Sequence, residues 1–302
     1  MDARLQRRIQ RYGWDRAVDF YDRHWLKQLQ PATQGVLERA AIAPGDRVLD
    51  VACGTGVLAL AAAAAVGRQG SVTGIDLSGK MVDTARAAAS ALGLDNCHFE
   101  RGDAEALPDL DGSFEVALCG LGLMYMPDPE RALAVMAQKL VPGARMAVSV
   151  WGQRSRCAWA EIFPIVDARV DSEVCPLFFR TGAGDTLHQA LQSAGLATVA
   201  SERLSVTLRY GSAAEACDAA FLGGPVALAY SRFDAATRAA VRVEYLQSLD
   251  SCRLGDAYAV PGEFLIGYGV KPAAVRGAAP AQVKSRELRH ADETLQPWEE
   301  TP

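Results

Sequence analysis

The stretch VLDVACGTG at residues 48–56 decides the fold of this chain. Its first half is apolar and predicts a buried strand, its second half is a glycine-rich turn, and an alanine-rich helical stretch follows at once. Glycines let the backbone approach a ligand closely, and the first turn of a helix offers free N–H groups. Gly54, Gly56 and Ala59 also fit the GxGxxA form of a dinucleotide fingerprint, which alone is weakly specific. The stretch therefore predicts a ligand-binding turn and leaves the ligand open.

Acidic residues near this turn narrow the choice of ligand. Asp50 ends the first strand four residues before Gly54, where a carboxylate suits a cationic ligand and repels a pyrophosphate. Asp76 ends the next predicted strand, twenty residues after Gly56, where an acid can accept hydrogen bonds from both ribose hydroxyls. The polar turn GDAEALP at residues 102–108 follows the third strand and can contact an adenine edge. Together these features favour an adenosine ligand with a positive charge.

Predicted strands and helices alternate through the first half of the chain. This alternation requires a parallel sheet covered by helices on both faces. The expected strands are 47–52, 71–76, 97–100, 114–119 and 145–151, and the expected helices are 56–66, 79–92 and 130–140. Residues 4–41 also predict helix, with a break or a new helix start at Pro31. Beyond residue 152 the alternation loosens, with helices expected at 186–194 and through most of 213–249, and strands at 199–210 and 262–270.

These blocks resemble the class I S-adenosylmethionine-dependent methyltransferases, and among them the ubiquinone/menaquinone C-methyltransferase-like family. The resemblance covers roughly residues 40–152. Its motifs are VLDVACGTG at 48–56, GIDLS at 74–78, GDAEALP at 102–108 and SFEVALCGLGLMYMPDPERAL at 113–133. It implies an α/β fold with a Rossmann-like seven-stranded sheet, six strands parallel and the seventh antiparallel, a helical N-terminal lid and helical cap insertions. It also implies S-adenosyl-L-methionine as the cofactor.

The resemblance assigns cofactor contacts residue by residue. The turn through Ala52, Gly54 and Gly56 should wrap the methionine part of the cofactor, and Asp50 should hold its ammonium group directly or through water. Asp76 should bind the ribose. The remaining contacts are expected at Leu77 and Met81 beside the adenine, Asp103 and Ala104 at its amino edge, Cys119 beneath the sulfonium, and Tyr21 as the lid tyrosine.

The chain departs from the family pattern at two places. The first glycine of the common DxGxGxG motif is Ala52 here, and the usual PGG before the fifth strand is Pro142-Gly143-Ala144. Residues 153–255 match no acceptor-specific motif. The resemblance therefore does not transfer a substrate to this chain.

Candidates for the acceptor site come from the residues alone. Tyr125 follows the fourth strand and should face the site of methyl transfer. His24 could act as a general base, although a histidine beside Trp25 on an amphipathic helix more often packs or lies at the surface. Five aromatic residues either wall an apolar pocket or fill the core of a cap: Trp151, Trp159, Phe163, Phe178 and Phe179.

The expected function is methyl transfer to a small or lipid-like, largely apolar organic acceptor. The sequence leaves open whether the attacking atom is oxygen, nitrogen, carbon or sulfur, and it does not indicate an oligomeric state. One alternative is a non-catalytic subunit that binds the cofactor or activates a partner. A second alternative is an NAD-dependent dehydrogenase.

Composition and charge argue against several other classes. The chain has 302 residues, half of them hydrophobic, and a net charge of −5, which suits a globular protein and not a nucleic-acid partner. The first thirty residues contain seven Arg or Lys against four Asp, which we interpret as a solvated helix face rather than an interaction patch. The longest apolar run, residues 57–66, is too short to span a bilayer, and the start lacks the apolar core of a signal peptide. A cytoplasmic location without an integral membrane segment is therefore expected.

Cysteine and histidine spacing argues against structural cross-links. The seven cysteines are widely spaced without a CxxC pair, and the four histidines form no HxxxH or HExxH pair, so neither a disulfide framework nor a metal site is expected. We expect a helical lid over residues 1–43 and a cofactor-binding core over 44–152. The remaining core strands and the acceptor cap should occupy 153–272, and a disordered tail 273–302.

Overall fold

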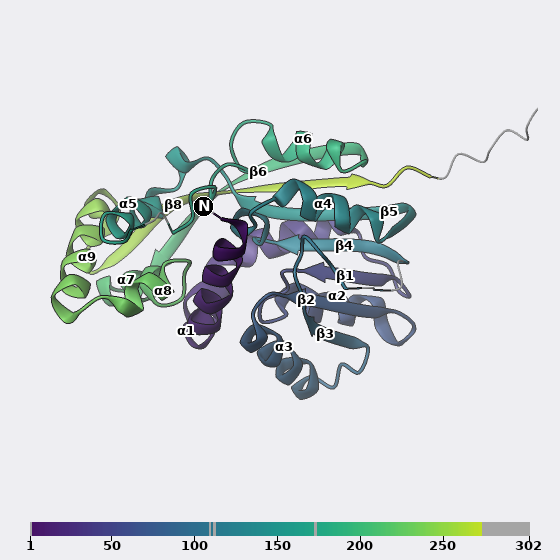
Figure 1. The fold of residues 1–302 in the computed structure, drawn as a ribbon, viewed down its shortest axis with the longest axis horizontal. Helices are drawn as coiled ribbons and strands as arrows, with labels where there is room; N and C mark the ends of the chain where they lie inside the picture. Colours follow the sequence, from purple (N-terminus) through teal and green to yellow (C-terminus); the bar gives the residue numbers. More distant parts are fainter. Residues whose placement is uncertain (1, 109, 111–112, 172–173, 274–302) are drawn as a thin grey trace, which may run out of the picture.

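The computed structural model describes residues 2–108, 110, 113–171 and 174–273, which are built around one eight-stranded sheet (Figure 1). Seven strands follow the order β3-β2-β1-β4-β5-β8-β6, and the short β7 pairs with β8. The strands are β1 Arg47–Val51, β2 Ser71–Asp76, β3 Cys97–Arg101, β4 Phe114–Gly120, β5 Leu140–Trp151, β6 Ala197–Tyr210, β7 Arg253–Leu254 and β8 Ala257–Val270.

Strand directions match the expected fold class. β1 to β5 pair in parallel with one another, and both β5 and β6 pair antiparallel with β8. β8 therefore runs against the other six strands of the seven-strand order. The predicted Rossmann-like α/β sheet is confirmed, and the two-residue β7 is an addition that the sequence analysis did not predict.

Helices cover the sheet, and polar side chains cap several of them. The Ser78 hydroxyl accepts a hydrogen bond from the Met81 amide at 3.2 Å at the start of α3, and Asp128 accepts one from the Arg131 amide at 2.9 Å at the start of α4. The helices are α1 Ala3–Ala40, α2 Val57–Val66, α3 Gly79–Ala91, α4 Pro129–Gln138, α5 Ile162–Asp167, α6 Thr186–Ser193, α7 Ala213–Phe221, α8 Ala227–Arg232 and α9 Ala235–Ser248. Short 3₁₀ turns occupy Gly67–Gln69, Leu123–Tyr125, Arg154–Arg156, Ala158–Glu161 and Asp250–Cys252.

The N-terminal helix α1 runs unbroken through Pro31, so the predicted break at that residue is wrong. Proline lacks a backbone N–H, which leaves the carbonyl of Lys27 without its helical partner. Lys27 and Pro31 are both exposed, so water can bond this carbonyl and the helix continues. As a single rod, α1 contacts β4 and β5 of the sheet as well as α7 and α8 (Figure 1).

Strand β5 begins earlier than the sequence predicts. It includes Pro142 and Gly143, which were expected to end the preceding helix. Gly143 has φ +83°, and its amide donates a hydrogen bond to the Lys271 carbonyl at 2.9 Å. The pairing with β4 shifts register between Phe114 and Val116. A bulge therefore absorbs the Pro-Gly turn inside the strand, and α4 ends at residue 138.

Helices α5, α7, α8 and α9 form a cap beside the sheet, whereas α6 packs against β6, β8 and α4. Helix α5 contacts α9, and α7 contacts α8 and α9. The Trp25 indole N–H donates to the Ala219 carbonyl at 2.9 Å, which ties α1 to α7. The predicted disordered tail lies, apart from residue 273, outside the described residues. Among the residues described, no helix has the length and apolar character needed to cross a membrane.

Candidate functional site

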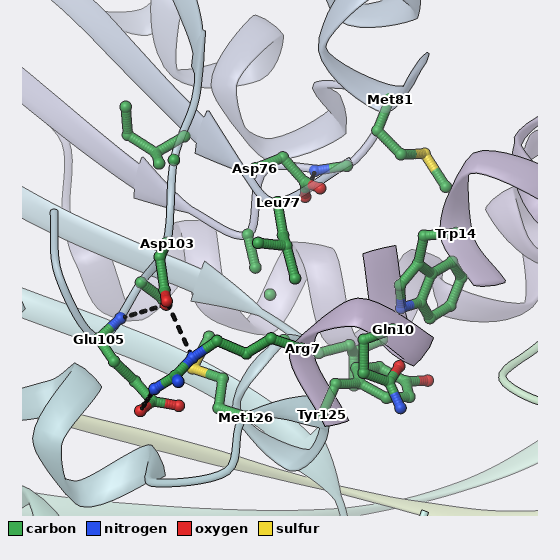
Figure 2. Close-up of a pocket in the computed structure, with 18 of the residues that line it drawn as sticks. Arg7, Gln10, Trp14, Asp76, Leu77, Met81, Asp103, Glu105, Tyr125 and Met126 are labelled. Carbon is green, nitrogen blue, oxygen red and sulfur yellow. Dashed lines mark hydrogen bonds and ion pairs between the residues drawn. The ribbon is translucent and has the colours of Figure 1, made fainter. Parts of the chain in front are cut away.

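A pocket opens beside the ends of β1, β2 and β4, where the strand order reverses between β1 and β4 (Figure 2). Open α/β sheets bind ligands at such switch points. The pocket has a volume of about 770 Å³, including the open space at its mouth. Its lining contains the predicted site residues Tyr21, Ala52, Gly54, Asp76, Leu77, Met81, Asp103, Ala104 and Tyr125.

The turn after β1 has a backbone conformation that few residues other than glycine adopt. The angle φ is +58° at Ala52, +55° at Gly54 and +90° at Gly56, in the left-handed region that favours glycine. Ala52 adopts it without being glycine, at a cost of about 1 kcal/mol. Gly56 is not among the lining residues. A Cβ there would lie 3.1 Å from the Cβ of Ala85, so this glycine allows α2 to start close against α3.

Asp76 is anchored at both carboxylate oxygens. Oδ2 accepts a hydrogen bond from the Gly54 amide at 2.9 Å, and Oδ1 accepts one from the Ser78 amide at 2.8 Å. Burial raises the pKa of Asp76 to about 6, although these two amides act to lower it. Each oxygen keeps a lone pair for a further donor, so the side chain could accept both hydroxyls of a diol.

Asp50 lies deeper, in a second pocket of about 530 Å³ that shares part of its wall with the first. It is fully buried, and within the described residues neither carboxylate oxygen has a hydrogen-bond partner. Burial, and then the charge of Asp76, raise the pKa of Asp50 to about 8, while the Ala59 amide, outside hydrogen-bond geometry, offsets only part of this rise. A buried carboxylate is costly unless a cation meets it. The second pocket is therefore suited to a cationic group.

Asp103 already contacts a side chain from α1. Nε of Arg7 lies 2.9 Å from Oδ2 of Asp103, and the Arg7 guanidinium also pairs with Glu105 (Figure 2). The Glu105 amide donates to Oδ1 of Asp103 at 3.0 Å. Glu105 is only 3% exposed and accepts a further hydrogen bond from the Asp128 amide at 3.1 Å. The sequence analysis missed Arg7 and Glu105, because no local spacing links residues 98 positions apart.

Two further polar contacts hold α1 over the pocket. Asp15 accepts a hydrogen bond from the Ser78 hydroxyl at 2.6 Å, and Asp22 accepts one from the Thr55 hydroxyl at 2.7 Å. Together with Arg7, these residues contact the loops that follow β1, β2 and β3. Their spacing of seven or eight residues places them on one face of the helix. Helix α1 therefore covers the pocket along that face.

A third pocket of about 350 Å³, here called the aromatic chamber, adjoins the other two. Tyr21 and Leu121 line all three pockets, and Trp14 and Tyr125 line both the first pocket and the chamber. Leu121 has φ +55°, and such strained backbone is often found at functional sites. The described residues that line the chamber include no charged side chain. They are Trp14, Tyr21, Trp25, Leu29, Leu121, Tyr125, Trp151, Trp159, Gly223, Gly224 and Pro225.

The two catalytic candidates occupy different places. The Tyr125 ring lies 5.0 Å from the Trp14 ring and 5.4 Å from the Phe178 ring, measured between centroids. Burial raises the pKa of Tyr125 well above its ordinary value, so its hydroxyl is a proton donor at neutral pH. His24 stacks on Phe20 and lines none of the three pockets. The structure therefore brings Tyr125 to the site and leaves His24 away from it.

Cys119 is fully buried at the end of β4 and lines none of the three pockets. Its sulfur packs against Gly122, where an added Cβ would lie 3.0 Å from Sγ and 2.5 Å from the Cβ of Ala52. Burial raises the pKa of the Cys119 thiol to about 12. The thiol therefore packs beneath the turn and is not a nucleophile at neutral pH.

Sequence comparisons with known proteins match part of the chain. Residues 48–143 match the family model described as "Methyltransferase domain". The 2-phytyl-1,4-naphtoquinone methyltransferase of Synechococcus elongatus is 44% identical over 113 residues, which cover 36% of this chain and 47% of that protein. The demethylmenaquinone methyltransferase of Bacillus cytotoxicus is 30% identical over 155 residues, which cover 51% of this chain and 62% of that protein. The chain thus spans about half the length of the curated relatives it matches.

A solved structure extends the similarity in fold. Phosphoethanolamine N-methyltransferase 2 of Haemonchus contortus, in complex with S-adenosyl-L-methionine, superposes with a TM-score of 0.57 at 15% identity. The match covers 85% of this chain and 57% of that one, so it includes strands beyond the region of sequence similarity.

Proposed function

We propose that this chain, in which residues 48–143 form a methyltransferase domain of the class I S-adenosylmethionine-dependent kind, transfers a methyl group to a small or lipid-like, largely apolar acceptor. The main support is the buried carboxylate of Asp50, which has no hydrogen-bond partner among the described residues and lies close to Asp76 at the switch point of the sheet. S-adenosyl-L-methionine offers an ammonium group to the first carboxylate and a ribose diol to the second. A pyrophosphate would instead meet negative charge there.

The residues around the pocket fit this cofactor, which supplies an electrophilic sulfonium methyl group when bound. The fit rests on Asp50, whose oxygens are otherwise without partners in the described chain. Backbone groups of the turn at Ala52 and Gly54 would take the rest of the methionine part. The other proposed contacts are Asp76 with the ribose, Leu77 and Met81 beside the adenine, Asp103 and Ala104 at its amino edge, and Tyr21 over the junction of the pockets.

The aromatic chamber is proposed to hold the acceptor. Tyr21 and Leu121 lie where the chamber meets both other pockets, so the cofactor and the acceptor would face each other there. The surrounding rings exclude water and limit the orientations of an acceptor, and methyl transfer gains from proximity and alignment. Burial raises the pKa of Tyr21 and of Tyr125. These hydroxyls would therefore donate hydrogen bonds to an acceptor oxygen rather than remove its proton.

The acceptor class follows from the chamber together with the relatives. The described lining of the chamber is aromatic and uncharged, which favours burial of an apolar or aromatic group. The names of the two curated relatives specify naphtoquinone and demethylmenaquinone acceptors. A quinol, the reduced and aromatic form of a quinone, is the acceptor class that agrees with both, because its electron-rich ring can attack the methyl group.

The two alternatives differ in what they bind and turn over. A non-catalytic subunit would bind S-adenosyl-L-methionine without releasing S-adenosylhomocysteine. A dehydrogenase would be stabilised by NAD, since a bound ligand stabilises the folded state by an amount that grows with the logarithm of its concentration relative to Kd. Methyl transfer accounts for both the Asp50 pocket and the uncharged chamber, and neither alternative accounts for the two together.

Thermal unfolding and product release test the proposal. We expect S-adenosyl-L-methionine and S-adenosylhomocysteine to raise the melting temperature and NAD to leave it unchanged. In the presence of cofactor, quinols and phenols should cause release of S-adenosylhomocysteine, and charged aliphatic amines should not. Stabilisation by NAD alone would contradict the proposal. Cofactor binding without release across quinols, phenols, amines and thiols would favour the non-catalytic subunit.

A further inference from the structure

Helix α1 has an outer face opposite the one that lines the pockets. Arg7, Trp14 and Tyr21 point toward the pockets at seven-residue spacing. The helical period of 3.6 residues places Leu5 and Tyr12 on the opposite side of the same helix. We call this side, with the exposed cations described below, the outer face of α1.

The apolar residues of the outer face are unusually exposed for their size. Leu5 is 36% exposed and Tyr12 50%. Of the six large hydrophobic side chains that are exposed in the described part of the chain, Leu5 and Tyr12 lie on this stripe, whereas Leu26 lines the pocket of Asp50. Single exposed hydrophobic residues are normal, but their alignment along one helix indicates a contact surface.

Cations flank this apolar stripe. Arg8, Arg16, Arg23 and Lys27 are exposed, and within the described residues none of them forms an ion pair or a side-chain hydrogen bond. Asp19 is exposed on the same stripe. The outer face is therefore positively charged although the whole chain has a net charge of −5.

We propose that the outer face of α1 docks on an anionic lipid surface. Helices that lie in a membrane interface combine cations for the lipid phosphates with leucine and aromatic residues that enter the headgroup region. Tyr12 has its ring exposed for such a contact, and the guanidinium of Arg11 lies over that ring at 5.4 Å from its centroid. These cations, which have no partner among the described residues, and the exposed Leu5 and Tyr12 together distinguish this face from the solvated helix face that the sequence predicts.

A lipid surface fits the outer face better than a nucleic acid does. A nucleic-acid phosphate backbone would use the four cations but leave the exposed Leu5 and Tyr12 without a partner. A helix is about 10 Å across, so a membrane on the outer face would lie within about one helix diameter of the pocket lining. A lipid-like acceptor would then enter the chamber from close range. Docking itself does not require the proposed methyl transfer and stands without it.

Vesicle flotation of the full chain tests the proposal. We expect the protein to float with phosphatidylcholine vesicles that contain phosphatidylserine and to remain behind with vesicles of phosphatidylcholine alone. Binding should fall as salt is raised, because screening weakens the attraction of the cations. Equal binding to both vesicle types, or no binding to either, would overturn the proposal.

Matched variants separate this face from the rest of the surface. Each cation near an anionic surface strengthens binding by about fivefold, so Arg8→Glu, Arg16→Glu and Arg23→Glu combined should reduce binding by more than about a hundredfold. Tyr12→Ser with Leu5→Ser should also weaken it. The controls are Arg68→Glu and Leu254→Ser, which change exposed residues away from α1 and should leave vesicle binding unchanged.

Three further readouts complete the test. The melting temperature of each variant and its stabilisation by S-adenosylhomocysteine show whether the fold and the cofactor pocket are intact. Loss of vesicle binding with both retained would support docking through the outer face. Vesicle binding that survives the charge reversals, or binding of the wild type to single-stranded oligonucleotides in preference to anionic vesicles, would contradict it.

Discussion

The carboxylates of Asp50 and Asp76 come from adjacent strands of the sheet, and the charge of Asp76 raises the pKa of the buried Asp50. The two groups differ in their surroundings. Asp76 accepts two backbone hydrogen bonds and has a pKa of about 6, whereas Asp50 lacks a partner among the described residues and has a pKa of about 8. Near neutral pH Asp50 therefore holds a proton that a cationic ligand should displace.

The stability of the cofactor-free protein should fall as pH rises. The native pKa of Asp50, about 8, lies above its ordinary value of 3.8. As pH rises, the unfolded state therefore releases this proton at a lower pH than the folded state does. The free energy of unfolding contributed by Asp50 therefore decreases between about pH 4 and about pH 8. Thermal melts across this range should give a smaller decrease for Asp50→Asn than for the wild type. Parallel curves for the two proteins would show that Asp50 does not titrate in this way.

Cofactor affinity should change with pH in the opposite direction. An ammonium group favours the ionised form of Asp50, so the affinity for S-adenosyl-L-methionine should rise by up to about tenfold per pH unit below pH 8. Calorimetry in two buffers of different ionisation enthalpy should detect a proton released on binding. Asp50→Asn should bind weakly and release no proton. Affinity that is independent of both pH and this substitution would remove Asp50 from the cofactor site.

Asp76→Ala should weaken binding of S-adenosyl-L-methionine by about 1.5–3 kcal/mol, the range for hydrogen bonds to a charged group. The same change leaves the Gly54 and Ser78 amides without their acceptor, so some loss of stability is also expected. Asp83→Ala, in an exposed ion pair on α3, is the matched control and should affect neither property. A folded Asp76→Ala protein with unchanged affinity would refute the ribose contact.

Arg7→Ala should destabilise the protein by about 1–3 kcal/mol, because it leaves the buried Glu105 beside Asp103 without a cation. The double variant Arg7→Ala with Glu105→Gln, in which both side chains are neutral, should recover part of this loss of stability. Arg8→Ala, one residue further along α1 and exposed, should be neutral in urea unfolding. Additive effects of the Arg7 and Glu105 changes would mean that the ion pair does not couple α1 to this loop.

The sequence predicts the local part of the site well and its long-range part poorly. Strand, turn and helix at residues 47–66 follow from apolar pattern and glycine spacing, and the structure places Asp76 beside Gly54 accordingly. The contact of Arg7 with Asp103 depends on the path of α1 across the sheet, which no local pattern encodes. The position of His24 depends on the path of α1 in the same way: its ring stacks on Phe20, and it lines none of the three pockets.

The aromatic chamber should determine affinity for the acceptor more than affinity for the cofactor. Trp159 lines the chamber but not the other two pockets, and its ring packs 4.6 Å from that of Trp151, measured between centroids. Trp159→Ala removes apolar contact with a bound acceptor and should raise KM for a quinol by about tenfold or more. The affinity for S-adenosyl-L-methionine should change by less than about twofold. The lost contact lies at the acceptor subsite and therefore weakens the binding of the acceptor alone.

This last test needs a variant that keeps the fold, because truncating a buried tryptophan costs about 3–5 kcal/mol. Trp159→Phe retains a ring and most of the volume, so it should fold and show a smaller rise in KM in the same direction. Tyr125 lines both the first pocket and the chamber, so Tyr125→Ala should instead lower turnover and affect both ligands. Unchanged acceptor kinetics in folded Trp159→Phe and Trp159→Ala proteins would place the acceptor outside the chamber and leave its tryptophans a packing role alone.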